Sequence, residues 1–227
     1  MRTQLTALIV ALFSLIGCEN MIESSNTYLA LGDSYTIGEG VDPSQRWPVQ
    51  LVDDLRTDGF NIEQARIIAK TGWTTDELMA AMDTTEFNPP YDMVSLLIGV
   101  NNQYRGRDTA NYRKELGKLM DRAIELAGDD AKKVFIVSIP DWGVTPFAQQ
   151  QGRNPGDIAE EIDAYNSIKM KMASRKGLDY INITNISREA INNPDYLADD
   201  GLHPSGKMYN AWVERILPVA KDILNKK

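Results

Sequence analysis

Short apolar runs alternate along the chain with longer segments in which apolar residues recur every three or four positions. The runs predict five buried strands, over residues 27–31, 61–69, 93–98, 134–139 and 179–183. The periodic segments predict helices over residues 44–58, 75–82, 109–127, 156–176 and 205–224. Strands that alternate with helices of this length indicate parallel βαβ units. We therefore expect a three-layer α/β/α sandwich with a doubly wound parallel sheet.

The first apolar run ends at a small polar turn that contains Gly32, Asp33 and Ser34. Open α/β sheets bind ligands beyond the carboxyl ends of their strands, so Ser34 stands where a nucleophile would be displayed. Asp and Ser are also common helix caps, and the tripeptide alone does not decide between the two roles. It is not the Gly-x-Ser-x-Gly elbow of the α/β-hydrolases.

Two later strands are followed by turns of the same kind. Gly72 lies in the turn after the second strand, and Asn101 lies in the Gly-Val-Asn-Asn turn after the third. Parallel strands bring such turns to one edge of the sheet. Taken singly, Gly72 is an ordinary turn glycine and Asn101 an ordinary turn residue.

His203 is the only histidine of the chain, so any imidazole base must be this residue. It lies in the loop before the last predicted helix, where Pro204 favours an extended backbone at position 203. Asp200 is three residues earlier, near enough to hold one ring nitrogen and leave the other free to accept a proton from a serine. Asp199 is a rival, but the three-residue offset favours Asp200. A lone loop histidine is more often a solvated residue, and the neighbouring aspartate is what favours catalysis.

The composition limits the partners of the protein. A chain of 227 residues is suited to one substantial α/β domain, and its net charge of -8 argues against a nucleic-acid partner. With one histidine and one cysteine, Cys18, the chain offers mainly carboxylates and amides as metal ligands, so we expect neither a metal nor a cofactor. No internal disulfide can form. The sequence assigns no oligomeric state.

The N-terminal residues read as a targeting segment. Residues 5–17 are apolar and follow Arg2, as in a signal peptide, and they are too short to span a bilayer comfortably. Leu15-Ile16-Gly17-Cys18 resembles the lipobox of bacterial lipoproteins, which implies cleavage before Cys18 and lipid on its sulfur. The alternative is that Cys18 is an incidental small residue. We expect a signal peptide over 1–17, a lipidated cysteine and tether over 18–26, and a domain over 27–227 anchored in the bacterial cell envelope.

Four blocks together resemble the SGNH, or GDSL, hydrolase family. They are Gly32-Asp33-Ser34-Tyr35, Gly72, Gly99-Val100-Asn101-Asn102 and Asp200-Gly201-Leu202-His203, and they occur in the order of the family over nearly the whole predicted domain. Each block is weak by itself, and four in order are a strong signal. The resemblance implies a flavodoxin-like α/β/α fold, in agreement with the alternation of strands and helices.

The resemblance also implies a role for each residue. Ser34 would be the nucleophile, His203 the general base and then acid, and Asp200 the residue that orients the imidazole. The backbone N–H groups of Ser34 and Gly72 and the side-chain amide of Asn101 would form the oxyanion hole. The third block of the family is usually Gly-x-Asn-Asp, whereas this chain has Asn102 in place of the aspartate.

The implied reaction is hydrolysis of a carboxylic ester through an acyl-serine. We expect a small-acyl or carbohydrate acetylesterase; the alternatives are a lysophospholipase or thioesterase, and a lipid-anchored binding protein that has lost catalysis. The substrate would be a small-molecule, carbohydrate or lipid ester. The loops at 39–47, 103–108 and 141–154 would surround the pocket, with Tyr104, Arg105 and Trp142 as candidate lining residues.

Overall fold

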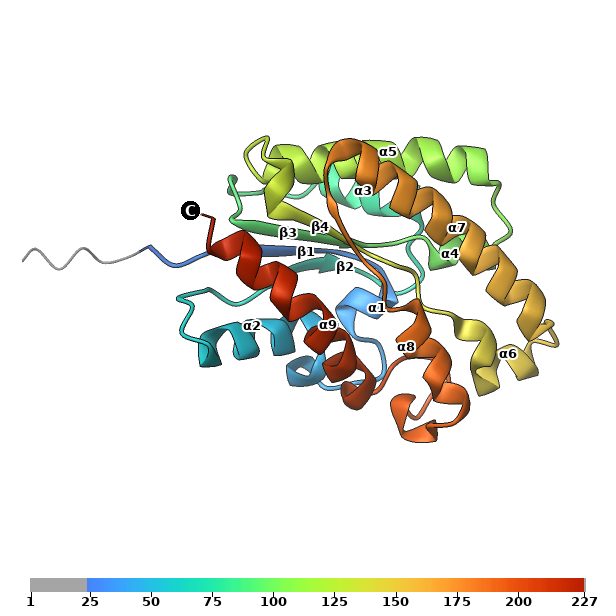
Figure 1. Cartoon of the computed structure of the whole chain (residues 1–227). Coiled ribbons are helices and arrows are strands. Elements are labelled where there is room, and N and C mark those ends of the chain that lie inside the picture. The colour runs from blue at the N-terminus through green and yellow to red at the C-terminus, as the bar shows by residue number, and fades with distance from the viewer. Residues whose placement is uncertain (1–23, 227) are drawn as a thin grey trace, which may run out of the picture.

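Five parallel strands form one sheet in the order β2-β1-β3-β4-β5 (Figure 1). The strands are β1 (Tyr28–Gly32), β2 (Arg66–Ala69), β3 (Met93–Leu97), β4 (Val134–Val137) and β5 (Asp179–Ile181). Ala30 in β1 is paired with Ile67 of β2 on one side and with Ser95 of β3 on the other. This order is that of a flavodoxin-like sheet, so the predicted doubly wound parallel architecture is confirmed.

The computed structural model describes residues 24–226. The predicted signal peptide over 1–17 and the predicted lipidation of Cys18 lie outside the described residues and stay predictions. Within residues 24–226, no helix combines the length and the apolar composition needed to span a bilayer.

Helices cover both faces of the sheet. The longer ones are α2 (Trp47–Thr57), α3 (Thr75–Asp83), α5 (Thr109–Leu126), α7 (Pro155–Lys176) and α9 (Gly206–Leu224). Figure 1 shows α3, α5 and α7 on one face and α2 and α9 on the other, and α2 packs against α9. The molecule therefore has the three layers that the sequence predicts.

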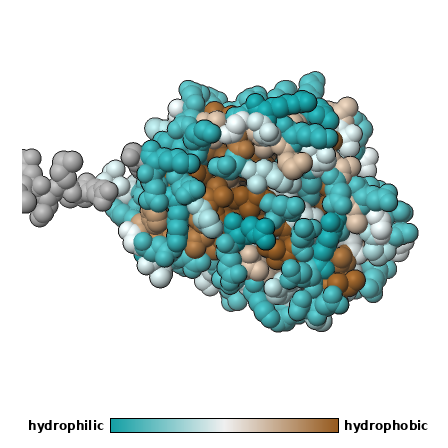
Figure 2. All heavy atoms as spheres, viewed as in Figure 1, coloured by the Kyte–Doolittle hydropathy of each residue, from teal (hydrophilic) through white to brown (hydrophobic). Residues whose placement is uncertain are grey.

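The helix α2 shows how the sequence sets this packing. Trp47, Leu51, Val52 and Leu55 recur at helical spacing, and all four are fully buried. Burying side chains of this size contributes roughly 1.5 to 3 kcal/mol each. On the face drawn in Figure 2, the outer sides of the helices are mostly hydrophilic, and apolar residues show chiefly in the band between the two helical layers.

Four predicted strands are longer than the observed ones: those over 93–98 and 134–139 by one and two residues, and those over 61–69 and 179–183 for reasons that the structure shows. The expected strand over 61–69 is reduced to β2, because Ile62 forms only an isolated bridge with Asn26 before the ladder begins at Arg66. The expected strand over 179–183 ends at Ile181. There the Asn182 side chain accepts a hydrogen bond from the Thr184 N–H (2.9 Å) and turns the chain into a short helix.

Several predicted loops contain short helices. These are α1 (Ser34–Ile37), α4 (Val100–Tyr104), α6 (Pro146–Gln150) and α8 (Thr184–Arg188), with 3₁₀ turns η2 (Ala131–Lys133), η3 (Trp142–Val144), η4 (Glu189–Ile191) and η5 (Pro194–Tyr196). A further 3₁₀ turn, η1 (Pro43–Gln45), replaces the start of the helix predicted over 44–58. Four or five residues are too few to show a helical period, so apolar spacing does not reveal such segments. Three of them, α1, α4 and α6, lie near the carboxyl edge of the sheet and carry residues of the site described next.

Candidate active site

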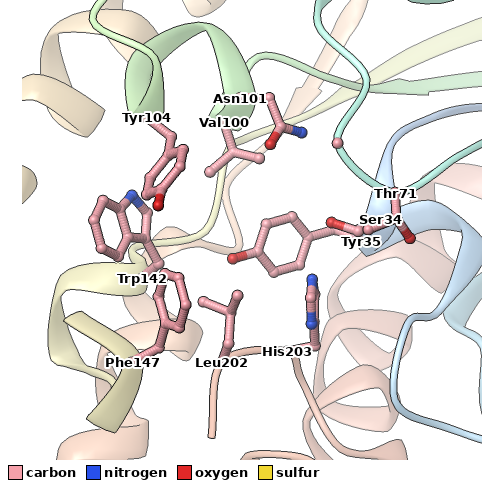
Figure 3. A pocket seen from close by; sticks show the side chains of 11 residues that line it. Ser34, Tyr35, Thr71, Val100, Asn101, Tyr104, Trp142, Phe147, Leu202 and His203 are labelled. Carbon is pink, nitrogen blue, oxygen red and sulfur yellow. The ribbon is translucent and has the colours of Figure 1, made fainter. Parts of the chain in front are cut away.

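A pocket opens at the carboxyl edge of the sheet, beside the end of β1. In the sheet β1 lies between β2 and β3, so the chain turns to one side of β1 to form β2 and to the other side to form β3. This switch in strand order is where open α/β sheets bind their ligands. The lining residues come from five separate stretches of the chain (Figure 3) and are Ser34, Tyr35, Thr71, Gly72, Val100, Asn101, Tyr104, Trp142, Phe147, Leu202 and His203.

Ser34 is the first residue of α1 and follows directly from the end of β1. Gly32 is required at the strand end, because a Cβ atom there would lie 2.1 Å from the hydroxyl oxygen of Thr36 and 2.4 Å from the carbonyl oxygen of Leu97. Asp33 caps α1, since its carboxylate accepts a hydrogen bond from the Tyr35 N–H at 3.1 Å. The capping role therefore belongs to Asp33, and Ser34 faces the pocket with 4 % of its surface exposed.

A buried pair of ionisable groups lies behind Ser34. Asp33 is fully buried, and burial raises the pKa of its carboxyl to about 7, although the Tyr35 N–H and the charge of Lys169 oppose this shift. Burial also lowers the pKa of Lys169, on α7, to about 7, although the Asp33 charge opposes it. The Lys169 ammonium donates to the carbonyl oxygen of Val137 (2.9 Å). Two groups with displaced pKa values thus lie in the protein interior next to the serine turn.

His203 is held by Asp200 as the spacing of the two residues predicts. The distance between His203 Nδ1 and Asp200 Oδ2 is 2.6 Å, and Asp200 Oδ1 accepts from the backbone N–H groups of His203 and Leu202 at 2.9 Å each. Partial burial would raise the pKa of Asp200, but these hydrogen bonds lower it below its usual value. Asp200, and not Asp199, is therefore the carboxylate on the imidazole.

An ionised Asp200 fixes the tautomer of His203. A carboxylate only accepts hydrogen bonds, so the ring proton lies on Nδ1 and the lone pair on Nε2. The ring also packs on Tyr35, with 5.5 Å between centroids, and its outer nitrogen points toward Ser34 in Figure 3. Among the described residues neither the Ser34 hydroxyl nor Nε2 has a hydrogen-bond partner, and catalytic hydrogen bonds are often long before substrate binds.

Asn101 and Gly72 lie on the same pocket. Asn101 Nδ2 donates one hydrogen bond to the carbonyl oxygen of Trp73 at 3.0 Å. A primary amide has two N–H groups, so a second donor remains for a ligand, and the first bond fixes its direction. Gly72 has a φ of 86°, a left-handed conformation that favours glycine. The carbonyl oxygen of Gly72 accepts from Arg105 at 2.7 Å.

Asn102 takes a supporting position beneath the turn. It is fully buried, its Oδ1 accepts from the Thr75 N–H (3.1 Å), and its Nδ2 donates to the Thr75 hydroxyl (2.6 Å). That hydroxyl in turn donates to Glu115. Because the single hydroxyl proton of Thr75 goes to Glu115, Thr75 needs a donor at position 102, which an amide supplies and an aspartate does not. Asn102 therefore fits this environment in place of the family aspartate.

The structure brings Ser34, Gly72, Asn101 and His203 into one pocket, with Asp200 bonded to His203 outside the lining, and it revises the other lining residues. Tyr104 and Trp142 line the pocket, whereas Arg105 lies outside the lining and holds Gly72. No residue of the predicted loop over 39–47 lines the pocket. The sequence reasoning missed five lining residues, Tyr35, Thr71, Val100, Phe147 and Leu202. Tyr35, Val100 and Leu202 lie inside the motif blocks and Thr71 precedes Gly72, which is a usable signal. Phe147 lies in the predicted pocket loop over 141–154, but nothing in the sequence marks it within that loop.

Comparisons with known proteins agree with this fold. The sequence model of the GDSL-like Lipase/Acylhydrolase family matches residues 30–211. No curated protein matches the chain. Among solved structures, TesA is 20 % identical, with a TM-score of 0.70 over 88 % of this chain and 100 % of the other.

Two further structures show the same fold. A lipase/acylhydrolase from Enterococcus faecalis is 21 % identical, with a TM-score of 0.64 over 88 % of this chain and 96 % of the other. An acetyl xylan esterase from Geobacillus stearothermophilus is 19 % identical, with a TM-score of 0.65 over 87 % of this chain and 95 % of the other. Identities this low establish the shared architecture alone.

Proposed function

Because this chain belongs to the GDSL-like lipase/acylhydrolase family, we propose that it hydrolyses carboxylic esters through an acyl intermediate on Ser34. The observation that carries the proposal is the 2.6 Å contact between Asp200 and His203, in a pocket that also holds Ser34. A nucleophile, a base and a residue that orients the base are the three parts that acyl transfer to serine requires.

In the first step, His203 Nε2 takes the hydroxyl proton of Ser34 as the serine oxygen attacks the ester carbonyl carbon. The carbonyl π electrons move onto the oxygen and give a tetrahedral intermediate. Asp200 stabilises the imidazolium that forms and keeps the ring in place. The bond from carbon to the alcohol oxygen then breaks, and the alcohol leaves with the proton from Nε2.

The negative oxygen of the intermediate needs fixed donors. The second N–H of the Asn101 amide, the Gly72 N–H and the Ser34 N–H are the donors we assign to it. Donors held in place before the reaction stabilise the developing charge more than they stabilise the neutral carbonyl. The hydrogen bonds from Asn101 and Arg105 to successive carbonyl groups hold the turn that carries Gly72.

Water completes the cycle. His203 Nε2 takes a proton from a water molecule, whose oxygen attacks the acyl carbon, and the bond to Ser34 breaks as the serine oxygen regains a proton. The sum is one ester and one water converted to one acid and one alcohol. No group beyond the protein and water is consumed.

We further propose that the acyl group is small. The alternative substrates, lysophospholipids and thioesters of long acyl chains, need room for a long chain, and turnover as a function of acyl length separates the two classes. The third possibility, a binding protein without catalysis, is disfavoured by the Asp200–His203 contact and by the unpartnered hydroxyl of Ser34.

The test replaces the nucleophile. Ser34→Ala should reduce hydrolysis of a short-chain aryl ester by roughly a thousandfold or more, and a serine-directed phosphonate should add its mass to the wild type but not to the variant. Ser174→Ala, at an exposed position of α7, is the matched control and should behave as wild type. Retained activity in Ser34→Ala would refute the assignment of the nucleophile.

A further inference from the structure

Three aromatic side chains form one wall of the pocket. Tyr104, Trp142 and Phe147 pack on one another, with ring centroids 5.3 Å apart for Tyr104 and Trp142 and 6.0 Å apart for Trp142 and Phe147. They come from α4, η3 and α6, and they lie at the end of the pocket away from Ser34 (Figure 3). Val100 and Leu202 add apolar surface next to them.

The chemistry of this wall disfavours a charged or hydroxyl-rich group. Among the described residues that line the pocket, none carries a carboxylate, an ammonium or a guanidinium group. The hydroxyls of Tyr35 and Tyr104 are the polar groups nearest the rings, and each hydrogen bond to water that a polar group loses there without replacement costs roughly 1 to 3 kcal/mol. An apolar group gains free energy at the same place.

The tetrahedral carbon of the intermediate indicates which part of the ester reaches the wall. One of its four bonds goes to the Ser34 oxygen, a second to the oxygen that Asn101 and Gly72 bind, and a third to the alcohol oxygen that His203 protonates. Figure 3 shows Asn101 on one side of the pocket and His203 on the opposite side. The fourth bond, to the acyl group, therefore points away from all three, toward the aromatic wall.

The size of the pocket limits the acyl group. Its volume is about 150 Å³. An apolar protein cavity of roughly 150 Å³ holds one benzene molecule, that is, six carbon atoms. A chain of four to six carbons or a benzoyl group is of the size that this space accommodates, and the further carbons of a long fatty-acyl chain extend beyond the pocket into solvent.

The position of Trp142 is fixed by a closed ring of polar contacts. Its indole N–H donates to Gln103 Oε1 (2.8 Å), and Gln103 Nε2 donates to Glu161 (2.5 Å). Glu161 also accepts from Arg153 (2.8 Å), and the Arg153 guanidinium lies 5.5 Å from the centre of the indole. Trp142 is held from the solvent side as well as from α4. Displacing the indole to make room for a longer acyl chain would break these contacts.

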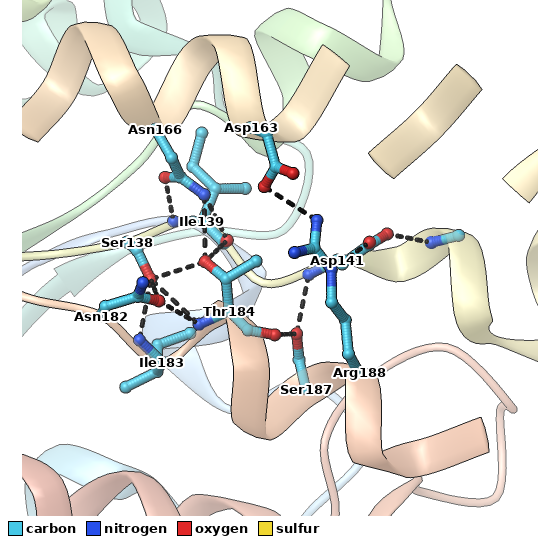
Figure 4. Close-up of polar contacts among 11 residues, drawn as sticks. Ser138, Ile139, Asp141, Asp163, Asn166, Asn182, Ile183, Thr184, Ser187 and Arg188 are labelled. Carbon is cyan, nitrogen blue, oxygen red and sulfur yellow. Dashed lines mark hydrogen bonds and ion pairs between the residues drawn. The ribbon is translucent and has the colours of Figure 1, made fainter. Parts of the chain in front are cut away.

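The residue before Trp142 is anchored independently (Figure 4). The Asp141 carboxylate accepts from the Gly143 N–H (2.8 Å) and from Arg188 (2.9 Å), and the Asp141 N–H donates to the Ser187 hydroxyl (2.8 Å). Arg188 is paired with Asp163 on α7. The loop that carries the indole is thereby tied to α7 and α8.

We propose that the Tyr104–Trp142–Phe147 wall binds the acyl group of the substrate and selects esters of apolar acids with four to six carbons or a benzoyl ring. The proposal rests on the function proposed for Ser34 and specifies its substrate class. Trp142 is the residue that sets the permitted length, because it is the buried and most firmly held member of the wall.

The experiment measures kcat/KM for p-nitrophenyl esters of acids with 2, 4, 6, 8 and 12 carbons and of benzoic acid. Each methylene group that enters an apolar site gains about threefold to fourfold in kcat/KM. We expect a rise of at least tenfold from acetyl to hexanoyl, a fall of similar size by dodecanoyl, and ready turnover of the benzoate. A maximum at acetyl or a continued rise to 12 carbons would overturn the proposal.

Two variants test the wall itself. In Trp142→Ala, the ratio of kcat/KM for the octanoyl ester to that for the hexanoyl ester should rise at least tenfold, because the space left by the indole admits about two further methylene groups. Tyr104→Ala, at a position with 41 % of its surface exposed, should fold without difficulty and show a smaller shift in the same direction. An unchanged acyl-length profile in both variants would overturn the proposal.

A second ester series tests the placement of the acyl group. The acyl group is held as acetate, and the alcohol is varied from methanol to butanol to phenol. For Trp142→Ala and Tyr104→Ala, the ratio of variant to wild-type kcat/KM should not depend on the alcohol. A dependence on the alcohol, with none on the acyl group, would place the leaving group at the wall and overturn the proposal. If no ester were turned over in a manner that depends on Ser34, the proposed function would itself fail.

Discussion

At the scale of single residues, the Asn101 amide combines a structural bond with the donor role proposed for it. Its Nδ2 donates to the Trp73 carbonyl oxygen, and the same nitrogen presents a second N–H to the pocket. The two bonds do not compete, because each uses a different N–H of the amide. The bond to Trp73 also fixes the direction in which the second N–H points. The sequence indicates the donor through its resemblance to a family block, but the partner at Trp73 is visible only in the structure.

Replacing Asn101 tests the oxyanion hole. Asn101→Ala should lower kcat roughly a hundredfold to a thousandfold, the typical loss for one such donor, with a smaller change in KM. Steady-state kinetics on a short-chain aryl ester measures both constants. Asn192→Ala, at an exposed position, is the control and should leave both unchanged. An unaltered kcat in Asn101→Ala would remove this residue from the hole.

At the scale of elements, the short helix α4 holds the turn that carries Gly72. Three side chains from its face or its end, those of Asn101, Asn102 and Arg105, bond to residues between Gly72 and Thr75. These bonds join the end of β3 to the segment after β2. Two of the proposed oxyanion donors, from Asn101 and Gly72, are thereby set relative to one another by α4.

Asn102 donates a hydrogen bond to the Thr75 hydroxyl, which donates in turn to Glu115. Substitutions can test whether this order of donor and acceptor matters. Asn102→Asp places a carboxylate where Thr75 needs a donor, so two carboxylates compete for one hydroxyl proton. We expect the free energy of unfolding to fall by about 1 to 3 kcal/mol, the cost of an unsatisfied buried polar group, and kcat to fall with it. Chemical denaturation and kinetics measure the two effects.

A second substitution should restore the two hydrogen bonds of Thr75 with donor and acceptor reversed. In Asn102→Asp with Glu115→Gln, the new amide at position 115 donates to the Thr75 hydroxyl, which then donates to the carboxylate at position 102. Both stability and kcat should return toward wild type. Glu115→Gln alone should cost less than Asn102→Asp, because its amide oxygen still accepts from Thr75 and only the part-buried bond from Asn111 Nδ2 (2.7 Å) loses its acceptor. No recovery in the double variant would mean that the carboxylate at position 115 does not determine the residue at position 102.

The elements that the sequence predicts are those with enough residues to show a period. The strands β1, β3 and β4 and the long helices α5, α7 and α9 lie close to the predicted ranges, since buried runs and helical stripes of this length are unambiguous. The short helices α4 and α6 are set by local hydrogen bonds instead. Thr145 caps α6 by accepting from the Ala148 N–H, an interaction that apolar spacing does not encode.

At the scale of the whole molecule, the site is assembled from residues that are distant in sequence, and the two parts of the site differ in how predictable they are. Ser34, Gly72 and Asn101 follow successive strands, so a parallel sheet brings them to one edge by its connectivity. The aromatic wall depends on where α6 and the η3 turn pack. That packing is fixed by Gln103, Arg153 and Glu161, and no sequence motif predicts their contacts.

The buried Asp33 beneath the site links the fold to pH. Its pKa is raised by burial to about 7, so the folded protein retains a proton that the unfolded chain loses near pH 4. This contribution to stability is complete below about pH 4 and is lost as the pH rises toward 7. The pKa of Lys169 is lowered to about 7, so Lys169 keeps its charge in the folded and the unfolded state below that pH. It therefore adds little to the pH dependence of the unfolding free energy there.

Asp33→Asn should remove this dependence and keep the helix cap, because asparagine caps as well as aspartate. Between pH 5 and pH 7, the wild type should lose about 2 kcal/mol of unfolding free energy relative to the variant. Urea denaturation of both proteins at the two pH values measures the difference, in which other titrating groups cancel. Parallel pH dependences would show that Asp33 is ionised in the folded protein well below pH 7.

The parallel sheet also separates the pocket from both ends of the described chain. The chain reaches β1 at the amino edge, where Asn26 pairs with Asn61, and α9 returns to the same edge, so that Asn225 lies near Ser24 (Figure 1). Ser34 lies at the opposite edge. An attachment ahead of Ser24, such as the lipid expected at Cys18, would therefore join the domain at the edge of the sheet opposite the mouth of the pocket. In a molecule tethered there, the whole depth of the sheet would lie between the point of attachment and Ser34.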